Sequence, residues 1–142
     1  MLAAMVATHK REITTHGQGD AHDLTDMVAR IVAESTCSEG IATIFVVGST
    51  AAVTTIEYEP GAIADLNALL EDIAPRNDDY RHHLRWGDDN GSSHVRAALL
   101  GPSLTIPFAR KELLAGTWQQ ILLLELDTRP RKREIVIQVM GE

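Results

Sequence analysis

The chain has 142 residues, of which 44% are hydrophobic and 4% aromatic, and its formal net charge is −7. This length fits one domain over residues 1–142, and the hydrophobic content supports a core of Leu, Ile, Val and Ala. The acidic balance argues against nucleic-acid binding, because that function uses a basic face to neutralise phosphates.

The single cysteine, Cys37, cannot form an internal disulfide, which argues against a secreted, disulfide-bonded scaffold. Its position at the end of a predicted helix favours a structural role over catalysis. The N-terminal stretch from Met1 is apolar but short and lacks the basic start of a signal peptide, so we predict the beginning of a strand. No apolar run approaches the about 20 residues of a membrane span, and we expect a cytoplasmic protein that does not bind membranes.

The first half of the chain predicts three strands and two helices. A loosely alternating strand over residues 6–15 is followed by helically spaced apolar residues between Leu24 and Val32. The continuous apolar run 41–47 indicates a buried central strand, which Gly48-Ser49-Thr50 interrupts before a second strand over 52–58. Pro60 suits the first turn of a helix with one apolar face, which Pro75 ends.

The second half begins with a polar segment, residues 76–90, that lacks apolar periodicity. We predict a short helix over 94–100, capped by Ser92 or Ser93 and ended by Gly101, and then a strand over 104–108 near a sheet edge. Two apolar strands, 118–126 and 134–140, follow and predict an antiparallel hairpin.

This order of elements predicts an α+β fold in a single domain. We expect a mixed, mostly antiparallel sheet with two main helices and a short third helix packed on it. The strand around residues 121–124 is apolar on both faces, so we predict that a neighbouring subunit covers one of them. The basic residues of 129–133 lie between two apolar runs and predict a solvated turn, with an anionic-ligand site as the alternative.

The segment from Tyr80 to His94 is the strongest candidate for chemistry. His82 and His94 could ligate Zn²⁺, Mn²⁺ or Fe²⁺, and Asp88 or Asp89 could be a third ligand or orient an imidazole. The spacing matches no closed structural metal signature, which favours an open site that keeps water. The alternative is that these are capping and surface residues.

Three other segments are candidate site residues. Ser49 and Thr50 offer hydroxyls to an anionic oxygen, although a β-bulge or tight bend is the favoured interpretation. Glu57 ends a strand and could reach the same cleft, or could complement the dipole of the following helix. Trp118, within Gly116-Thr117-Trp118-Gln119, could wall a pocket or pack in the core. The other histidines outside this segment, His9, His16 and His22, are scattered, and no role is assigned to them.

Together these motifs resemble the YjbQ-like family, also labelled secondary thiamine-phosphate synthase. The resemblance covers about residues 10–142. It is carried by segments 48–52, 54–59, Tyr80-x-His82, Gly87-Asp88-Asp89-Asn90, His94, 100–107, Gly116-Thr117-Trp118-Gln119 and 138–142.

The resemblance implies a homotrimer with a site at the subunit edge and a divalent metal, zinc being the ion we expect. It places His82 and His94 at the family's histidine positions and Asp89 at its acidic position. It also places Gly116 to Gln119 at a strand-opening motif. Many relatives carry His-Thr-Thr or His-Thr-Ser where this chain has Ser49-Thr50-Ala51, so Ser49 replaces a histidine and a metal ligand there would be lost.

The family label implies that a pyrimidinylmethyl diphosphate is joined to a thiazole phosphate with release of pyrophosphate. Such chemistry needs a divalent cation, magnesium being the alternative to zinc, and polar groups around the leaving oxygens. We assign Asp88, Asp89 and Glu57 to the cation, Ser49 and Thr50 to phosphate, and Gly116 to Gln119 to the substrate. The competing hypothesis is a homotrimeric ligand-binding or scaffold protein whose metal is structural or adventitious.

Overall fold

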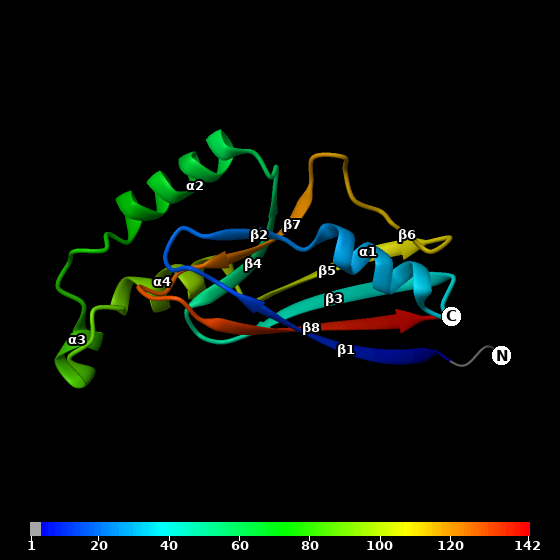
Figure 1. Cartoon of the computed structure of the whole chain (residues 1–142), viewed down its shortest axis with the longest axis horizontal. Coiled ribbons are helices and arrows are strands. Elements are labelled where there is room, and N and C mark those ends of the chain that lie inside the picture. The colour runs from blue at the N-terminus through cyan, green and yellow to red at the C-terminus, as the bar shows by residue number, and fades with distance from the viewer. Residues whose placement is uncertain (1–3) are drawn as a thin grey trace.

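The computed structural model describes residues 4–142, which form strands and helices in an α+β arrangement (Figure 1). The predicted fold class is confirmed, although the strands form two sheets rather than one. The elements are β1 (Met5–Thr14), β2 (Ala21–Asp23), α1 (Thr25–Glu34), β3 (Glu39–Val47), β4 (Ala51–Ile56), α2 (Pro60–Ile73), α3 (Arg81–Trp86), α4 (Gly91–Leu100), β5 (Ser103–Ala109), β6 (Glu112–Leu113), β7 (Gln120–Glu125) and β8 (Lys132–Gly141).

Every pair of neighbouring strands is antiparallel within the described part of the chain. The larger sheet has the order β1-β8-β3-β5-β6, and the smaller one has the order β2-β7-β4. β3 is therefore central, as its apolar run predicts, and β5 lies next to the edge. The opening strand is β1, and the part of its prediction that concerns residues 1–3 lies outside the described residues.

The predicted hairpin of the last two strands is wrong. β7 lies between β2 and β4, whereas β8 lies between β1 and β3 in the other sheet. At the connection, a buried ion pair in which Arg133 Nη2 donates to Glu125 Oε2 at 2.6 Å joins the end of β7 to the start of β8. This pair fixes the chain where it passes between the two sheets.

The prediction that residues 129–133 form a solvated turn also fails in part. Arg133 is only 6% exposed. Arg131 donates from Nε to Asp127 Oδ2 at 2.9 Å, so it too bonds to a carboxylate of the same chain. Because both guanidinium groups are already paired, they are poorly placed to bind an external anion.

The two faces of β7 are covered within one chain. Ile121 and Leu123 belong to the larger core cluster, with α1, β3 and β8. Leu122 and Leu124 belong to a smaller cluster that includes Leu70 of α2 and residues of α4. The prediction that a neighbouring subunit covers one face of this strand is therefore wrong, because two core clusters of the same chain bury both faces.

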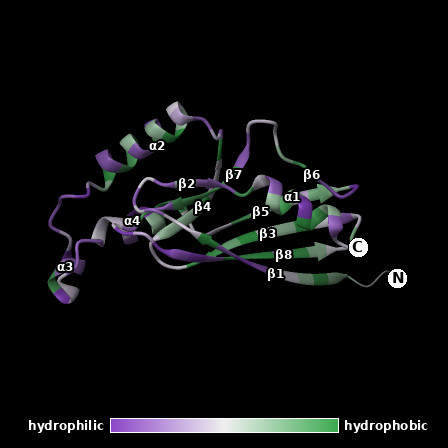
Figure 2. Ribbon diagram, viewed as in Figure 1, coloured by the Kyte–Doolittle hydropathy of each residue, from purple (hydrophilic) through white to green (hydrophobic). Residues whose placement is uncertain are grey.

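Hydrophobic residues follow β3, β5 and β8, while hydrophilic residues gather in the connection between α2 and α3 (Figure 2). Cys37 is buried in the larger core cluster, in keeping with a structural role. Among residues 4–142, none of the helices is long and apolar enough to cross a membrane. The helices α3 and α4 lie together at one end of the molecule, where they hold the candidate site (Figure 1).

Candidate functional site

Two short helices place the candidate histidines. The polar segment predicted to be irregular contains α3, which carries His82, and α4 carries His94 in its first turn. Gly91 allows the two helices to approach, because a Cβ atom there would lie 2.4 Å from Tyr80 Cβ. The Gly91 N–H also donates to His83 Nε2 at 3.1 Å, which fixes the end of α4 against α3.

The rings of His82 and His94 face each other. Their centroids are 4.5 Å apart, and the ring planes are tilted by 37°. His82 Nδ1 lies 3.0 Å from Asp88 Oδ1. This nitrogen is buried, and its alignment with Asp88 falls outside hydrogen-bond geometry. The pair is a close polar contact that a small shift of the His82 ring would convert into a hydrogen bond.

Asp88 is held in turn by a neighbouring amide. When the Asn90 side chain is oriented with its nitrogen toward Asp88, it donates to the two carboxylate oxygens at 3.0 and 3.3 Å. Asn90 is 7% exposed. A carboxylate fixed in this way beside an imidazole is the usual arrangement for orienting a metal-binding or proton-transferring histidine.

The environment of His94 favours its neutral form. Burial lowers the pKa of His94, and the nearby His82 ring lowers it further, while Asp127 and Asp88 partly oppose the shift. A neutral imidazole has a free lone pair, so at neutral pH His94 is able to ligate a metal or accept a proton.

Ser49 lies across a pocket from His94. The pocket has a volume of about 350 Å³ and its other walls are small or apolar. Ser49 itself is exposed at the bend between β3 and β4, where the chain passes from the larger to the smaller sheet. The pocket is lined by Gly48, Ser49, Ala51, His94, Ala97, Ala98 and Pro102.

Thr50 is buried and its hydroxyl is already engaged. It donates to Asp127 Oδ2 at 3.0 Å and accepts from Arg133 Nη2 at 2.7 Å. The predicted donation from Thr50 to a phosphate would break this arrangement, so of the two hydroxyls only that of Ser49 faces the pocket. Burial acts to raise the pKa of Asp127, but bonds from Arg131, Thr128 and Thr50 outweigh it and lower the pKa.

Asp89, Glu57 and the segment Gly116 to Gln119 do not join the histidines within one chain. Asp89 is exposed and lines a separate pocket with His83. Glu57 follows β4 and is also exposed. Gly116, Thr117 and Gln119 line a pocket beside α1 and β6, and Trp118 is 69% exposed.

Ser92 and Ser93 lie inside the first turn of α4 rather than capping it, because the helix begins at Gly91. Both are fully buried, and neither hydroxyl has a hydrogen-bond partner within the described residues. Unpaired buried hydroxyls are costly and mark the start of α4 as a place that a polar ligand or water would satisfy. In the sequence, polar residues before an apolar run predict a helix cap, and this signal does not distinguish a cap from buried hydroxyls inside the first turn.

The donor set at α3 and α4 fits a divalent transition metal. Two imidazoles and a carboxylate are suitable ligands, and the buried Nδ1 of His82 has no hydrogen bond. His82 and His94 would hold the ion, with Asp88 as a further ligand or as the group that orients His82. The donor atoms of His82, Asp88 and His94 do not all lie within 4.8 Å of one another. In residues 4–142, the donor atoms of His16, Asp20 and His22 do.

The fold and this site define a single-domain α+β protein with paired histidines between two short helices. The family model described as UPF0047 protein YjbQ-like matches residues 9–142, and the chain belongs to this family. A UPF0047 protein of Methanothermobacter thermautotrophicus is 35% identical over 137 residues, which cover 96% of this chain and 94% of the relative.

Solved structures share the fold. A YbjQ-like protein of unknown function from Sulfolobus solfataricus has a TM-score of 0.87 and 32% identity, covering 97% of this chain and 100% of that chain. An uncharacterised YjbQ/UPF0047 family protein from Clostridium acetobutylicum has a TM-score of 0.82 and 29% identity, covering 92% of this chain and 98% of that one. These likenesses support the fold of the whole domain without assigning a reaction.

Proposed function

We propose that the chain is a metal-dependent enzyme acting on a small phosphorylated metabolite in the cytoplasm, with its centre at His82 and His94. The observation that carries this proposal is the 4.5 Å separation of the two rings, beside a carboxylate 3.0 Å from His82. Bound there, a zinc ion would act as a Lewis acid toward a phosphoryl oxygen.

The chain's own groups would then position the substrate. Ser49 would donate its hydroxyl to a phosphate oxygen across the pocket that it shares with His94. His94, whose pKa is lowered by burial, would accept a proton or ligate the ion in its neutral form. Asp88 would keep His82 oriented, and Asp89, on a separate pocket, would have no direct role unless the 87–90 turn moved.

The reaction that the family label suggests is thiamine-phosphate synthesis, and we propose it as a secondary activity. The carbon–oxygen bond to the diphosphate would break, the thiazole nitrogen would form a bond to the same carbon, and pyrophosphate would leave with the electron pair. Stabilising that leaving group requires a cation, with magnesium as the alternative to zinc.

We further propose that the enzyme is a homotrimer. Three large hydrophobic side chains are unusually exposed on one chain, at 87% for Leu84, 65% for Trp86 and 69% for Trp118. Exposed apolar groups of this size commonly mark contact surfaces. A neighbouring chain that supplied Glu57 and the segment Gly116 to Gln119 would complete the site that one chain leaves divided.

The same exposed residues favour a second candidate, a trimeric binding or scaffold protein whose metal is structural. The two candidates are separated by metal analysis of the purified protein and of the variants His82→Ala and His94→Ala, with His9→Ala as a control on β1. For the enzyme, the histidine variants lose zinc and activity but keep the native mass. For the scaffold, they dissociate or unfold.

Synthase activity is assayed with the diphosphate and thiazole phosphate substrates and the metal-loaded protein. Thiamine phosphate formed above the buffer rate, and reduced in His94→Ala, would support the specific reaction. Formation equal to buffer would remove the synthase assignment while leaving the metal site to be judged by the metal analysis.

A further inference from the structure

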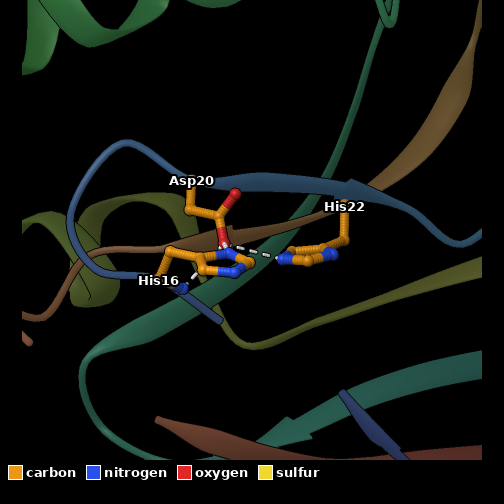
Figure 3. Close-up of side chains that lie close together, drawn as sticks. All are labelled: His16, Asp20 and His22. Carbon is orange, nitrogen blue, oxygen red and sulfur yellow. Dashed lines mark hydrogen bonds and ion pairs between the residues drawn. The ribbon is translucent and has the colours of Figure 1, made fainter. Parts of the chain in front are cut away.

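Three residues that the sequence leaves unassigned come together in the turn before β2. Asp20 Oδ2 lies 3.2 Å from His16 Nδ1 and 2.7 Å from His22 Nε2 (Figure 3). The three donor atoms all lie within 4.8 Å of one another. Both imidazoles therefore point toward the same carboxylate oxygen.

The fold holds this arrangement from both ends. On one side, the Thr15 hydroxyl donates to the buried Glu125 at 2.6 Å, immediately before His16. On the other side, β2 pairs with β7, and His22 is opposite Leu123. The ligand positions are therefore anchored to the core although the turn between them is at the surface.

Two glycines make the turn possible. Gly17 has φ 126° and Gly19 has φ 89°, which are backbone conformations that favour glycine. The Asp20 N–H donates to Gly17 O at 3.1 Å, and Gly19 N–H donates to Glu125 O at 3.0 Å. This tight turn brings the side chains of residues 16 and 20 onto one side.

The separations of Asp20 from the two histidines suit a common ion. Two ligands bound tetrahedrally at zinc distances of about 2.0–2.1 Å would be about 3.3 Å apart. The Asp20 to His16 separation already has this value, at 3.2 Å. The Asp20 to His22 separation would open from 2.7 Å by about half an ångström, a small ring movement that inserts the metal in place of a hydrogen bond.

The Asp20 carboxylate has the negative charge and, within residues 4–142, the unbonded oxygen that a metal ligand needs. Burial acts to raise the pKa of Asp20, but bonds from the His16 backbone and from the rings of His22 and His16 outweigh it and lower the pKa. The carboxylate is thus ionised at neutral pH. Within residues 4–142 the hydrogen bonds reach Oδ2, which leaves Oδ1 available.

We propose that His16, Asp20 and His22 form a second metal site, selective for divalent transition ions of the zinc class. Two imidazole nitrogens and one carboxylate oxygen make a three-ligand site with a position left for water, and the His16 side chain is 82% exposed. The site uses neither His82 nor His94 and does not depend on the proposed enzyme. Its ion would fasten the turn to β2.

The test uses the full-length protein carrying His82→Gln and His94→Gln, so that metal bound at the proposed active site does not contribute. Zn²⁺ binding is measured by calorimetry, and Co²⁺ binding by its visible absorption. We expect one ion per chain, and His16→Gln or His22→Gln to weaken binding by at least about 10-fold to 100-fold. Asp20→Asn is a third variant, and His9→Gln is the control that leaves affinity unchanged.

A Co²⁺ spectrum typical of a four- or five-coordinate nitrogen and oxygen site would further support the assignment. Absence of saturable binding in the His82→Gln, His94→Gln protein would overturn it, as would binding only at millimolar metal. Binding that His22→Gln and His16→Gln leave unchanged would also overturn it. Circular dichroism of each variant shows whether the fold is kept, and His16→Gln, at an exposed position, is the variant least able to disturb it.

Discussion

The imidazole of His82 lies over that of His94 with 4.5 Å between ring centroids, although the two residues belong to different helices. Burial lowers the pKa of His94, and the His82 ring at this distance lowers it further. His94 is therefore favoured in its neutral form, in which it can bind an ion or accept a proton.

The titration of His94 depends on its burial and on the neighbouring His82 ring. Its pKa lies below the ordinary value of 6.5, because of burial and the neighbouring His82. His82→Gln should raise the pKa of His94 toward that value, whereas Asp127→Asn should lower it further. Proton NMR titration of the metal-free protein measures both shifts, and a fall in His82→Gln would contradict the assignment.

The same shift predicts how stability depends on pH. The folded chain binds fewer protons at His94 than the unfolded chain between the two pKa values, so the free energy of unfolding rises with pH in that window. This contribution is complete above the unfolded pKa of 6.5 and declines as the pH falls below it. Urea unfolding of the metal-free protein between about pH 5 and pH 8 measures the slope, and His94→Gln should reduce it.

Gly91→Ala should separate the two histidines. The new Cβ would lie 2.4 Å from Tyr80 Cβ, so α3 must move away from α4. We expect a loss of about 1–3 kcal/mol in the free energy of unfolding and weaker metal binding at His82 and His94. Gly116→Ala is the matched control for stability, because a Cβ there meets nothing closer than 3.6 Å. Equal effects of the two substitutions would argue against a special role for the Tyr80 contact.

Arg133→Met should destabilise the whole domain. It leaves Glu125 charged and without its ionic partner, and this carboxylate is fully buried. Removing one member of a buried pair costs about 3–5 kcal/mol, whereas replacing both can be nearly neutral. The double variant Arg133→Met, Glu125→Met should therefore recover part of the loss in urea unfolding, and a double variant less stable than the single one would refute this account.

Ser49 and Thr50 should behave differently although they are adjacent. Ser49→Ala removes an exposed hydroxyl beside His94, so we expect an unchanged melting temperature and weaker binding of inorganic phosphate to the zinc-loaded protein. Thr50→Val leaves buried Asp127 without one donor and should cost about 1–3 kcal/mol. Phosphate affinity and thermal unfolding, measured on both variants, separate the two roles. A large loss of stability in Ser49→Ala would contradict the assignment.

Local patterns in the sequence determined much of the architecture. The apolar run at 41–47 predicted the central strand, and Pro60 marked the first residue of α2. Periodicity located α1, and the order of the predicted elements indicated an α+β domain. The histidine-rich segment was identified as the candidate site because polar residues, two glycines and three histidines were concentrated in it. These features are local, so neighbouring residues suffice to define them.

Only the tertiary structure decided which strands pair and which side chains meet. The adjacent apolar runs of β7 and β8 predict a hairpin, but β7 pairs with β2 and β4, and β8 pairs with β1 and β3. His16 and His22 meet at Asp20 because Gly17 and Gly19 adopt positive φ angles in the turn and because β2 pairs with β7. Strand pairing and charge burial depend on residues that lie far apart along the chain, and a single sequence records each residue without its spatial neighbour.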